Sequence, residues 1–423
     1  MTQTRFALWG DLIWSQTPAR LNILPGYCVV VEDGQVASVE ARPPEDGTPV
    51  HDCRGKLIIP GMTDLHLHAP QYTYRGTGMD LELLDWLAQN AFPEEARYAD
   101  PGYARRAYRI FADDLKRSPT TRACIFATVH ADASLELARQ LEESGLICYV
   151  GKVNMDRDSP DDLREAGPEE SERETRRFLT GMEGFRRVKP ILTPRFVPSC
   201  SDSCMERLGA LQREFGLPVQ SHLSENQGEI ALVAQLCPDT AFYGQAYDKW
   251  GLFGGGAPTI MAHCVYSGAE EQALMQERGV FIAHCPQSNT NIASGIAPVR
   301  RYLDRGLRLG LGTDVAGGAH LSLFRAVTDA IQVSKLYWRL VDQDCRPLTM
   351  PEAFWMATRG GGAFFGRVGA FEPGYAFDAL VLDDSALPTP RPLEPAARLE
   401  RLLYLADERQ IAAKYVAGTQ IDI

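Results

Sequence analysis

The chain has 423 residues, of which 45% are hydrophobic, and its 43 basic and 55 acidic residues give a net charge of −12. An acidic chain lacks the basic surface that attracts a nucleic-acid backbone or an anionic membrane, so we expect neither partner. It has no run of about 18 apolar residues, and Met1–Ser15 lacks the cationic and long apolar regions of a secretory signal, so we expect a cytoplasmic protein. Apart from Cys200 and Cys204, the cysteines lie singly in the sequence, which is typical of reduced, buried thiols.

The two ends of the chain share a β-rich pattern. Near the amino end, Tyr27–Val31 and Val36–Val39 alternate like strands around a turn at Glu32–Gln35. Near the carboxyl end, Phe377–Leu382 and Ala412–Ala417 have the same character. We therefore expect residues 1–60 and 371–423 to form one small β-sandwich that flanks a central unit of residues 61–370.

In the central unit, strand-like runs alternate with helical stretches such as Leu81–Asn90, Ser134–Ser144 and Pro168–Gly184. The expected strands are Leu65–His68, Arg122–His130, Leu146–Val153, Val188–Phe196, Pro218–His222, Thr259–His263, Val280–His284 and Arg308–Asp314. Eight strands separated by helical segments predict a (β/α)8 barrel of the TIM type.

Titratable residues gather at the carboxyl ends of these strands, the face on which such barrels build active sites. The residues concerned are His66, His68, His130, His222, His263, His284 and Asp314. The alternation Leu65-His66-Leu67-His68 has the strand period, so His66 and His68 point to one face. We expect His130 and His284 to have supporting or packing roles.

Four of these residues form a plausible set of metal ligands. His66, His68, His222 and Asp314 offer three nitrogen donors and one carboxylate, which suits zinc, or iron(II) as the alternative, with a position left for water. Glu225 follows His222 by three residues and can reach the mouth of the barrel, where a carboxyl group can carry protons. Taken alone, Glu225 would be read as an ordinary glutamate in the first turn of a helix.

Several motifs together resemble the guanine deaminases, a family of the amidohydrolase superfamily. The resemblance runs through the whole central unit and into both flanks. His-Leu-Ser-Glu and Thr-Asp elements are shared by many deaminases, whereas His-Ala-Pro-Gln-Tyr, Thr-Pro-Arg-Phe and Asp-Val-Ala-Gly-Gly are more specific. The matching stretches are Pro60–Tyr72, Leu84–Leu87, Phe92–Glu95, Thr193–Phe196, Gln220–Asn226, Ile282–Pro286 and Gly310–Gly318.

The resemblance implies a zinc-dependent aminohydrolase that converts guanine to xanthine and ammonia in purine catabolism or salvage. It implies one zinc ion per chain, bound by His66, His68, His222 and Asp314, and a homodimer. Asp314 would take a proton from the attacking water, Glu225 would protonate the ring nitrogen and then the amine, and His263 would hold the water. The residues that it implies for the purine site are His68, Gln71, Arg195, Phe196, His222, Glu225 and Asp314.

Three alternatives remain at this point. A related cyclic-amide hydrolase with two metals would need a carboxylated lysine at the end of the fourth strand, where Arg195 stands, although Lys152 lies near the end of the third. A cytidine-deaminase type of site would need a Pro-Cys-x-x-Cys motif, and Cys200 and Cys204 have the wrong spacing. A non-catalytic scaffold would be expected to lose metal ligands, which this chain keeps.

Overall fold

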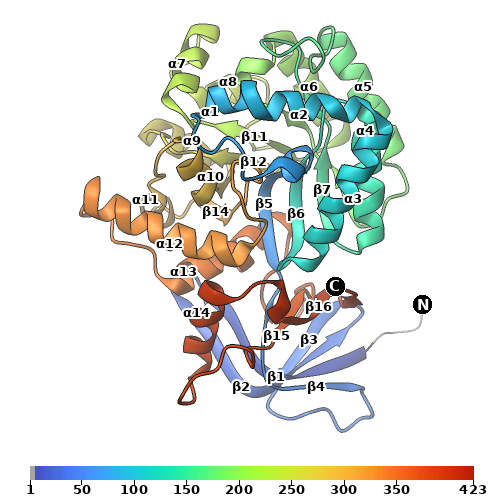
Figure 1. The fold of residues 1–423 in the computed structure, drawn as a ribbon, viewed down its shortest axis with the longest axis vertical. Coiled ribbons are helices and arrows are strands. Elements are labelled where there is room, and N and C mark those ends of the chain that lie inside the picture. The colour runs from blue at the N-terminus through green and yellow to red at the C-terminus, as the bar shows by residue number, and fades with distance from the viewer. Residues whose placement is uncertain (1–4) are drawn as a thin grey trace.

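The computed structural model describes residues 5–423, so residues 1–4 of the expected amino-terminal unit lie outside the described part. Two sheets organise the molecule, an eight-stranded sheet surrounded by helices and a seven-stranded sheet below it (Figure 1). No helix within residues 5–423 is both long and apolar enough to cross a membrane.

The eight-stranded sheet is parallel and has the strand order β11-β12-β13-β14-β5-β6-β7-β9. Its strands are β5 (Met62–His68), β6 (Thr120–Phe126), β7 (Ile147–Gly151), β9 (Val188–Pro190), β11 (Val219–Leu223), β12 (Thr259–His263), β13 (Phe281–His284) and β14 (Arg308–Leu311). Strands at all eight expected places are present, and this part of the chain is a mixed α/β structure.

Helices connect the successive strands. They are α1 (Leu83–Trp86), α2 (Phe92–Ala96), α3 (Pro101–Arg117), α4 (Ala131–Ser144), α5 (Pro168–Gly181), α6 (Asp202–Phe215), α7 (Gln227–Leu236), α8 (Tyr243–Asp248), α9 (Ala269–Arg278), α10 (Pro286–Asn291), α11 (Val299–Asp304), α12 (Leu323–Leu340) and α13 (Met350–Trp355). In place of the expected helix over Leu81–Asn90, the structure has α1 followed by a π-helical turn at Leu87–Ala91.

The expected fourth strand, Val188–Phe196, is broken in the structure. Only β9 pairs with β7, while β10 (Thr193–Pro194) pairs with β8 (Val153–Asn154) in a separate two-stranded sheet. Pro190 and Pro194 have no N–H to donate to a neighbouring strand, which accounts for the interruption. Arg195 follows directly and donates its backbone N–H to Asn154 O at 3.2 Å.

Leu192, inside this interruption, connects the two outer strands of the sheet. Its N–H donates to Pro218 O at 2.9 Å, and its carbonyl accepts from Gln220 N–H at 2.9 Å. These bonds form a parallel bridge between Leu192 and Val219. The segment after β9 is thus linked to β11 at the opposite end of the strand order.

The two ends of the chain form the seven-stranded sheet, in the order β17-β16-β15-β4-β1-β2-β3. Its strands are β1 (Arg5–Thr17), β2 (Arg20–Glu32), β3 (Gln35–Glu40), β4 (Val50–Pro60), β15 (Ala379–Leu382), β16 (Ile411–Val416) and β17 (Thr419–Ile421), and α14 (Pro395–Leu405) lies beside them. β1 and β2 have 13 residues each, so β2 extends well beyond the strand-like run Tyr27–Val31, and β1 precedes both runs that the sequence indicates. Register shifts at Gly10/Leu12 and Ser15/Thr17 let this long pair twist.

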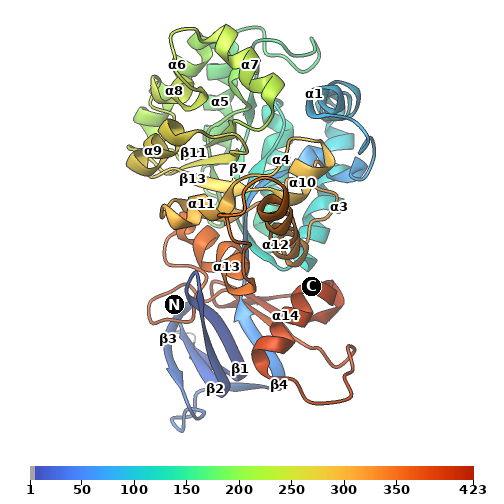
Figure 2. The ribbon, with the colours of Figure 1, turned by 90° about the vertical axis from the view of Figure 1, so that its left-hand side faces the viewer.

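The two sheets are joined at the strand that carries the first two histidines. β4 continues through Gly61 into β5, and Gly61 N–H donates to Asp378 O at 3.0 Å. A Cβ at Gly61 would lie 2.3 Å from Thr121, so the close approach requires glycine. Asp378 also pairs with Arg122 at 2.6 Å, and both side chains are buried. Figure 2 shows α13 at the same junction, where it contacts β1 and β2.

Candidate active site

The structure brings the four proposed metal ligands together at the carboxyl ends of their strands. His66 and His68 share one face of β5, His222 lies on β11, and Asp314 follows β14. Asp314 Oδ1 lies 3.1 Å from His66 Nε2 and 3.4 Å from His68 Nε2. His68 Nε2 and His222 Nε2 are 3.2 Å apart. All four ligand atoms therefore face one small space.

The chemistry of these donors fits a divalent metal ion. Both ring nitrogens of His66 and Nδ1 of His68 are buried without a hydrogen-bond partner among the described residues. Burial lowers the pKa of His66, His68 and His222, which keeps their rings neutral and able to donate a lone pair. Burial alone would raise the pKa of Asp314, but the facing histidines hold it well below its usual range. Within residues 5–423, two groups could hold an ion, His66-His68-Asp314 and His66-His222-His263, and both contain His66.

Buried hydrogen bonds orient these ligands. His222 Nδ1 donates to Arg195 O at 2.6 Å, which leaves its Nε2 for the metal. Asp64 accepts from the N–H groups of His66 at 3.2 Å and Thr313 at 3.1 Å, and from the Thr313 hydroxyl at 2.6 Å. Burial raises the pKa of Asp64 to about 7. The sequence prediction did not assign Asp64 a role, although it stands two residues before His66 in the first motif.

Glu225 and His263 lie beside the four ligands and face each other. Glu225 Oε2 is 3.3 Å from His263 Nε2, and Glu225 Oε1 accepts from the Ser294 hydroxyl at 2.8 Å. His263 Nδ1 donates to Asn289 Oδ1 at 2.8 Å. Glu225 precedes α7 by two residues, so its reading as a glutamate of the first helical turn is wrong. The sequence prediction missed Ser294 and Asn289, which are separated from these partners by long stretches of chain.

The electrostatics of this pair suit proton transfer. Burial raises the pKa of Glu225 to about 7. For His263, burial alone would lower the pKa, but the carboxylates of Glu225 and Asp314 outweigh it and the pKa is raised. His263 and Asp314 also have positive φ angles of 69° and 45°, and backbone strain of this kind persists where the surroundings fix the geometry.

A small cavity of 30 Å³ lies next to the ligands. Polar and charged side chains line one part of its wall, and apolar side chains line the rest. The lining residues are His68, Gln71, Leu83, Trp86, Leu87, Arg195, Phe196, His222, Glu225, His263, Ile292 and Asp314. Ligand pockets usually measure ~300–1,000 Å³, so this space is smaller than a usual ligand pocket. The sequence predicts the lining segment Leu83–Leu87 as part of a helix but does not predict its place at the site.

Gln71 and Arg195, two of the expected purine-binding residues, are held by a third buried residue. Glu95 on α2 accepts from Gln71 Nε2 at 2.7 Å and from both terminal nitrogens of Arg195, at 2.5 and 3.0 Å. Glu95 lies in a stretch that matched the family motifs, but the sequence prediction gave it no role.

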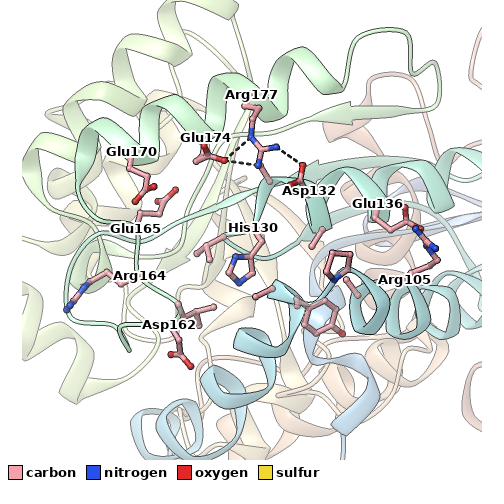
Figure 3. A pocket seen from close by; sticks show the side chains of 18 of the residues that line it. Arg105, His130, Asp132, Glu136, Asp162, Arg164, Glu165, Glu170, Glu174 and Arg177 are labelled. Carbon is pink, nitrogen blue, oxygen red and sulfur yellow. Dashed lines mark hydrogen bonds and ion pairs between the residues drawn. The ribbon is translucent and has the colours of Figure 1, made fainter.

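His130 is not among the residues that line the cavity beside the ligands, and Figure 3 shows the side chains around it. It lines a separate cavity of 490 Å³ near the start of α4. Arg177 at the wall of that cavity pairs with Asp132 at 2.5 Å and with Glu174 at 2.8 Å, so these charges are matched (Figure 3). His284 is fully buried, and burial lowers its pKa to about 3.

Lys152 does not offer a free amine for a bridging carbamate. Its Nζ pairs with Glu165 and donates to Val153 O at 3.0 Å, and both side chains are buried. Arg195 stands directly after β10, at the position where that alternative would need the lysine. This geometry does not favour the alternative with two metals.

Comparisons with known proteins identify the family of the chain. A model of the amidohydrolase family matches residues 57–421. The chain belongs to the amidohydrolase family. This amidohydrolase is 39% identical over 381 residues to the guanine deaminase of Mus musculus, and the match covers 86% of this chain and 83% of the relative. It is 33% identical over 378 residues to the guanine deaminase of Escherichia coli strain K12, covering 87% and 84% respectively.

A solved structure extends the likeness to the fold. The crystal structure of guanine deaminase from C. acetobutylicum, with guanine bound in the active site, matches with a TM-score of 0.96 and 46% identity, over 99% of this chain and 100% of that one. Within its family, the amidohydrolase described here thus groups with the guanine deaminases, and it is a hydrolase of a metal-dependent family.

Proposed function

We propose that this amidohydrolase is a guanine deaminase that hydrolyses guanine to xanthine and ammonia. One observation carries the proposal: a single cavity is lined by histidines that could hold a metal ion, a carboxyl group with a pKa near neutrality and a buried arginine. The histidines and the carboxyl group provide hydrolytic chemistry. The arginine provides hydrogen-bond donors for a heterocycle with acceptors along one edge. The guanine deaminases to which the chain is similar support the choice of substrate.

His66, His68, His222 and Asp314 would hold one zinc ion per chain, with iron(II) as the alternative. When bound, the ion supplies a Lewis acid that lowers the pKa of water toward neutrality. Asp314, whose pKa is held low, is ionised and accepts a proton from the attacking water. His263 holds that water and stabilises negative charge as it develops.

Glu225 moves the protons that the substrate needs. With a pKa of about 7, it is present in both protonation states near neutral pH. In its protonated form it donates to the ring nitrogen beside C2. Its carboxylate then takes the proton of the new C2 hydroxyl and passes it to the departing amine, and the proton held by Asp314 restores protonated Glu225. The Ser294 hydroxyl, 2.8 Å from Glu225 Oε1, fixes the direction of the carboxyl group.

Arg195, Gln71 and Phe196 recognise the base. Arginine has only donors and remains charged, so it suits the O6 and N7 acceptors of guanine. Adenine carries an amine in place of O6, which would set donor against donor. Phe196 provides an aromatic wall, and His68, His222, Glu225 and Asp314 complete the site on the side of the reacting carbon.

The proposal extends to the organisation of the protein. Residues 61–370 form a closed (β/α)8 barrel, supported by the bonds of Leu192 to the β11 edge, and residues 1–60 with 371–423 form a small sandwich domain, supported by a separate hydrophobic core. The enzyme acts as a cytoplasmic homodimer in purine catabolism or salvage. The buried, free cysteines are consistent with a reducing compartment.

Turnover of guanine tests the proposal. Purified protein should release one ammonia and one xanthine per guanine, measured by ultraviolet absorbance and by an ammonia assay, and metal analysis should find about one zinc per chain. A folded, zinc-loaded protein that releases no ammonia from guanine would refute the function. About two metals per chain would favour the alternative with two metals.

A further inference from the structure

Glu95 is a buried acidic residue that touches neither the metal ligands nor the proton-transfer pair. It lies on α2 and is 1% exposed, and its two carboxylate oxygens receive three hydrogen bonds from side chains of the cavity wall. Those side chains come from the segment after β5 and from the end of β10, so one carboxylate links two distant parts of the base pocket.

The position of Glu95 fixes the orientation of the Gln71 amide. Gln71 Nε2 donates to Glu95 at 2.7 Å, while Gln71 Oε1 accepts from Ala316 N–H at 3.2 Å. A flipped amide would place its oxygen against the carboxylate and its nitrogen against another donor. Both contacts would be repulsive, so Gln71 presents its remaining N–H and its remaining lone pair in fixed directions.

Glu95 also determines which donors of Arg195 are available. The carboxylate binds Nη1 and Nη2, so the end of the guanidinium group is occupied. The Phe92 ring, whose centroid is 5.0 Å from Arg195 Cζ, lies against the group and limits its rotation. Among the described residues no other side chain is bonded to the guanidinium, which leaves Nε–H and the outer terminal N–H groups for a ligand.

We infer that Glu95 is a positioning residue that makes the pocket selective for a neutral base with an exocyclic carbonyl beside a ring-nitrogen acceptor. Glu95 directs the unoccupied donors of Arg195 toward the carbonyl edge of the base. The negative charge of Glu95 offsets the positive charge of Arg195, so the pair does not favour an anionic ligand. This inference rests on the proposed function, because it assumes that the base lies in this cavity.

The test compares two ligands that lack the reacting amine. Hypoxanthine has the carbonyl and the adjacent ring nitrogen of guanine, whereas purine lacks the carbonyl. Calorimetry on the zinc-loaded wild type should give tighter binding of hypoxanthine than of purine. Glu95→Gln should reduce this preference at least about tenfold, the range for a lost hydrogen bond to a charged group, while purine binding changes little. Equal weakening of both ligands, or an unchanged preference, would overturn the inference.

Glu94→Gln is the matched control, because Glu94 is on the same helical turn but binds Thr73 and Tyr103 instead. It should retain the wild-type preference. If Glu95→Gln does not fold, Arg195→Gln is compared with the double variant Glu95→Gln/Arg195→Gln. Equal preferences for hypoxanthine over purine in these two proteins support the inference that Glu95 acts through Arg195. A difference above about threefold between the two preferences overturns the inference. Guanine turnover by the wild type is measured separately, so failure of the proposed function is distinguishable from failure of the role of Glu95.

Discussion

Replacing Glu225 by glutamine removes the proposed proton carrier while preserving its shape. Glu225 is 3% exposed, and its two oxygens face the Ser294 hydroxyl and His263 Nε2. In Glu225→Gln, the amide oxygen can still accept from Ser294, and the amide N–H can face an unprotonated His263. We therefore expect the variant to fold and to bind metal normally, because Glu225 belongs to neither group of possible ligands.

The expected loss lies in turnover. Loss of acid–base catalysis typically lowers the rate by ~10²–10⁴-fold, equivalent to about 3–5 kcal/mol in the barrier. The wild-type kcat should fall as pH rises above about 7, where Glu225 loses its proton, and the variant should lack this dependence. Steady-state rates against pH and zinc analysis of both proteins measure these effects.

Glu270→Gln is the control for the loss of a carboxylate, because Glu270 is an exposed glutamate in the first turn of α9. It should have the wild-type rate and pH profile. If Glu225→Gln turns over guanine within about threefold of the wild type, or keeps the wild-type pH limb, then Glu225 does not carry the proton. Loss of zinc in parallel with activity would instead make Glu225 a ligand.

Three further predictions concern the metal, the substrate and the fold. His222→Ala should lose most bound zinc and nearly all activity, and normal metal content by elemental analysis would refute its role as a ligand. Arg195→Ala should lower kcat/KM for guanine by ~10²-fold or more with little effect on a low adenine rate; because Glu95 then stays buried without its cationic partner and keeps only the bond from Gln71, melting temperatures must be compared as well. Lys414 is fully buried, and burial lowers its pKa to about 7, so the folded state binds fewer protons than the unfolded state above that pH. Stability should therefore rise with pH from about 7 toward the usual lysine pKa, by up to about 1.4 kcal/mol per pH unit, and urea titrations of Lys414→Met should show a flatter rise.

Much of the architecture could be predicted because its signals are local. The alternation at Leu65–His68 marks a strand with two histidines on one face, and the structure has β5 there. Polar residues at successive strand ends are likewise visible in the sequence, and the parallel sheet brings His66, His222 and Asp314 to the same edge. Parallel pairing places the carboxyl ends of strands that are far apart in the sequence beside one another. The residues at these strand ends therefore already include most of the proposed metal ligands.

Contacts that depend on side-chain direction could not be predicted in this way. Glu95 and Arg195 are 100 positions apart, and Ser294 and Glu225 are 69 apart, so no periodic pattern relates them. The interruption of the fourth strand did have a local signal, since Pro190 and Pro194 both lack an N–H, but the apolar residues between them resemble a continuous strand.

The cavity separates two buried electrostatic units that respond differently to pH. Glu225 and His263 face each other beside the ligands, and the pKa of Glu225 is about 7. Glu95 and Arg195 form the other unit, a buried ion pair with a distance of 2.5 Å between Nη1 and the carboxylate oxygen, in which arginine offers only donors. A change of pH around neutrality should therefore alter proton transfer while leaving the donors offered to the base unchanged. In kinetic terms, turnover should depend on pH more strongly than the binding of an uncharged base such as hypoxanthine over the same range.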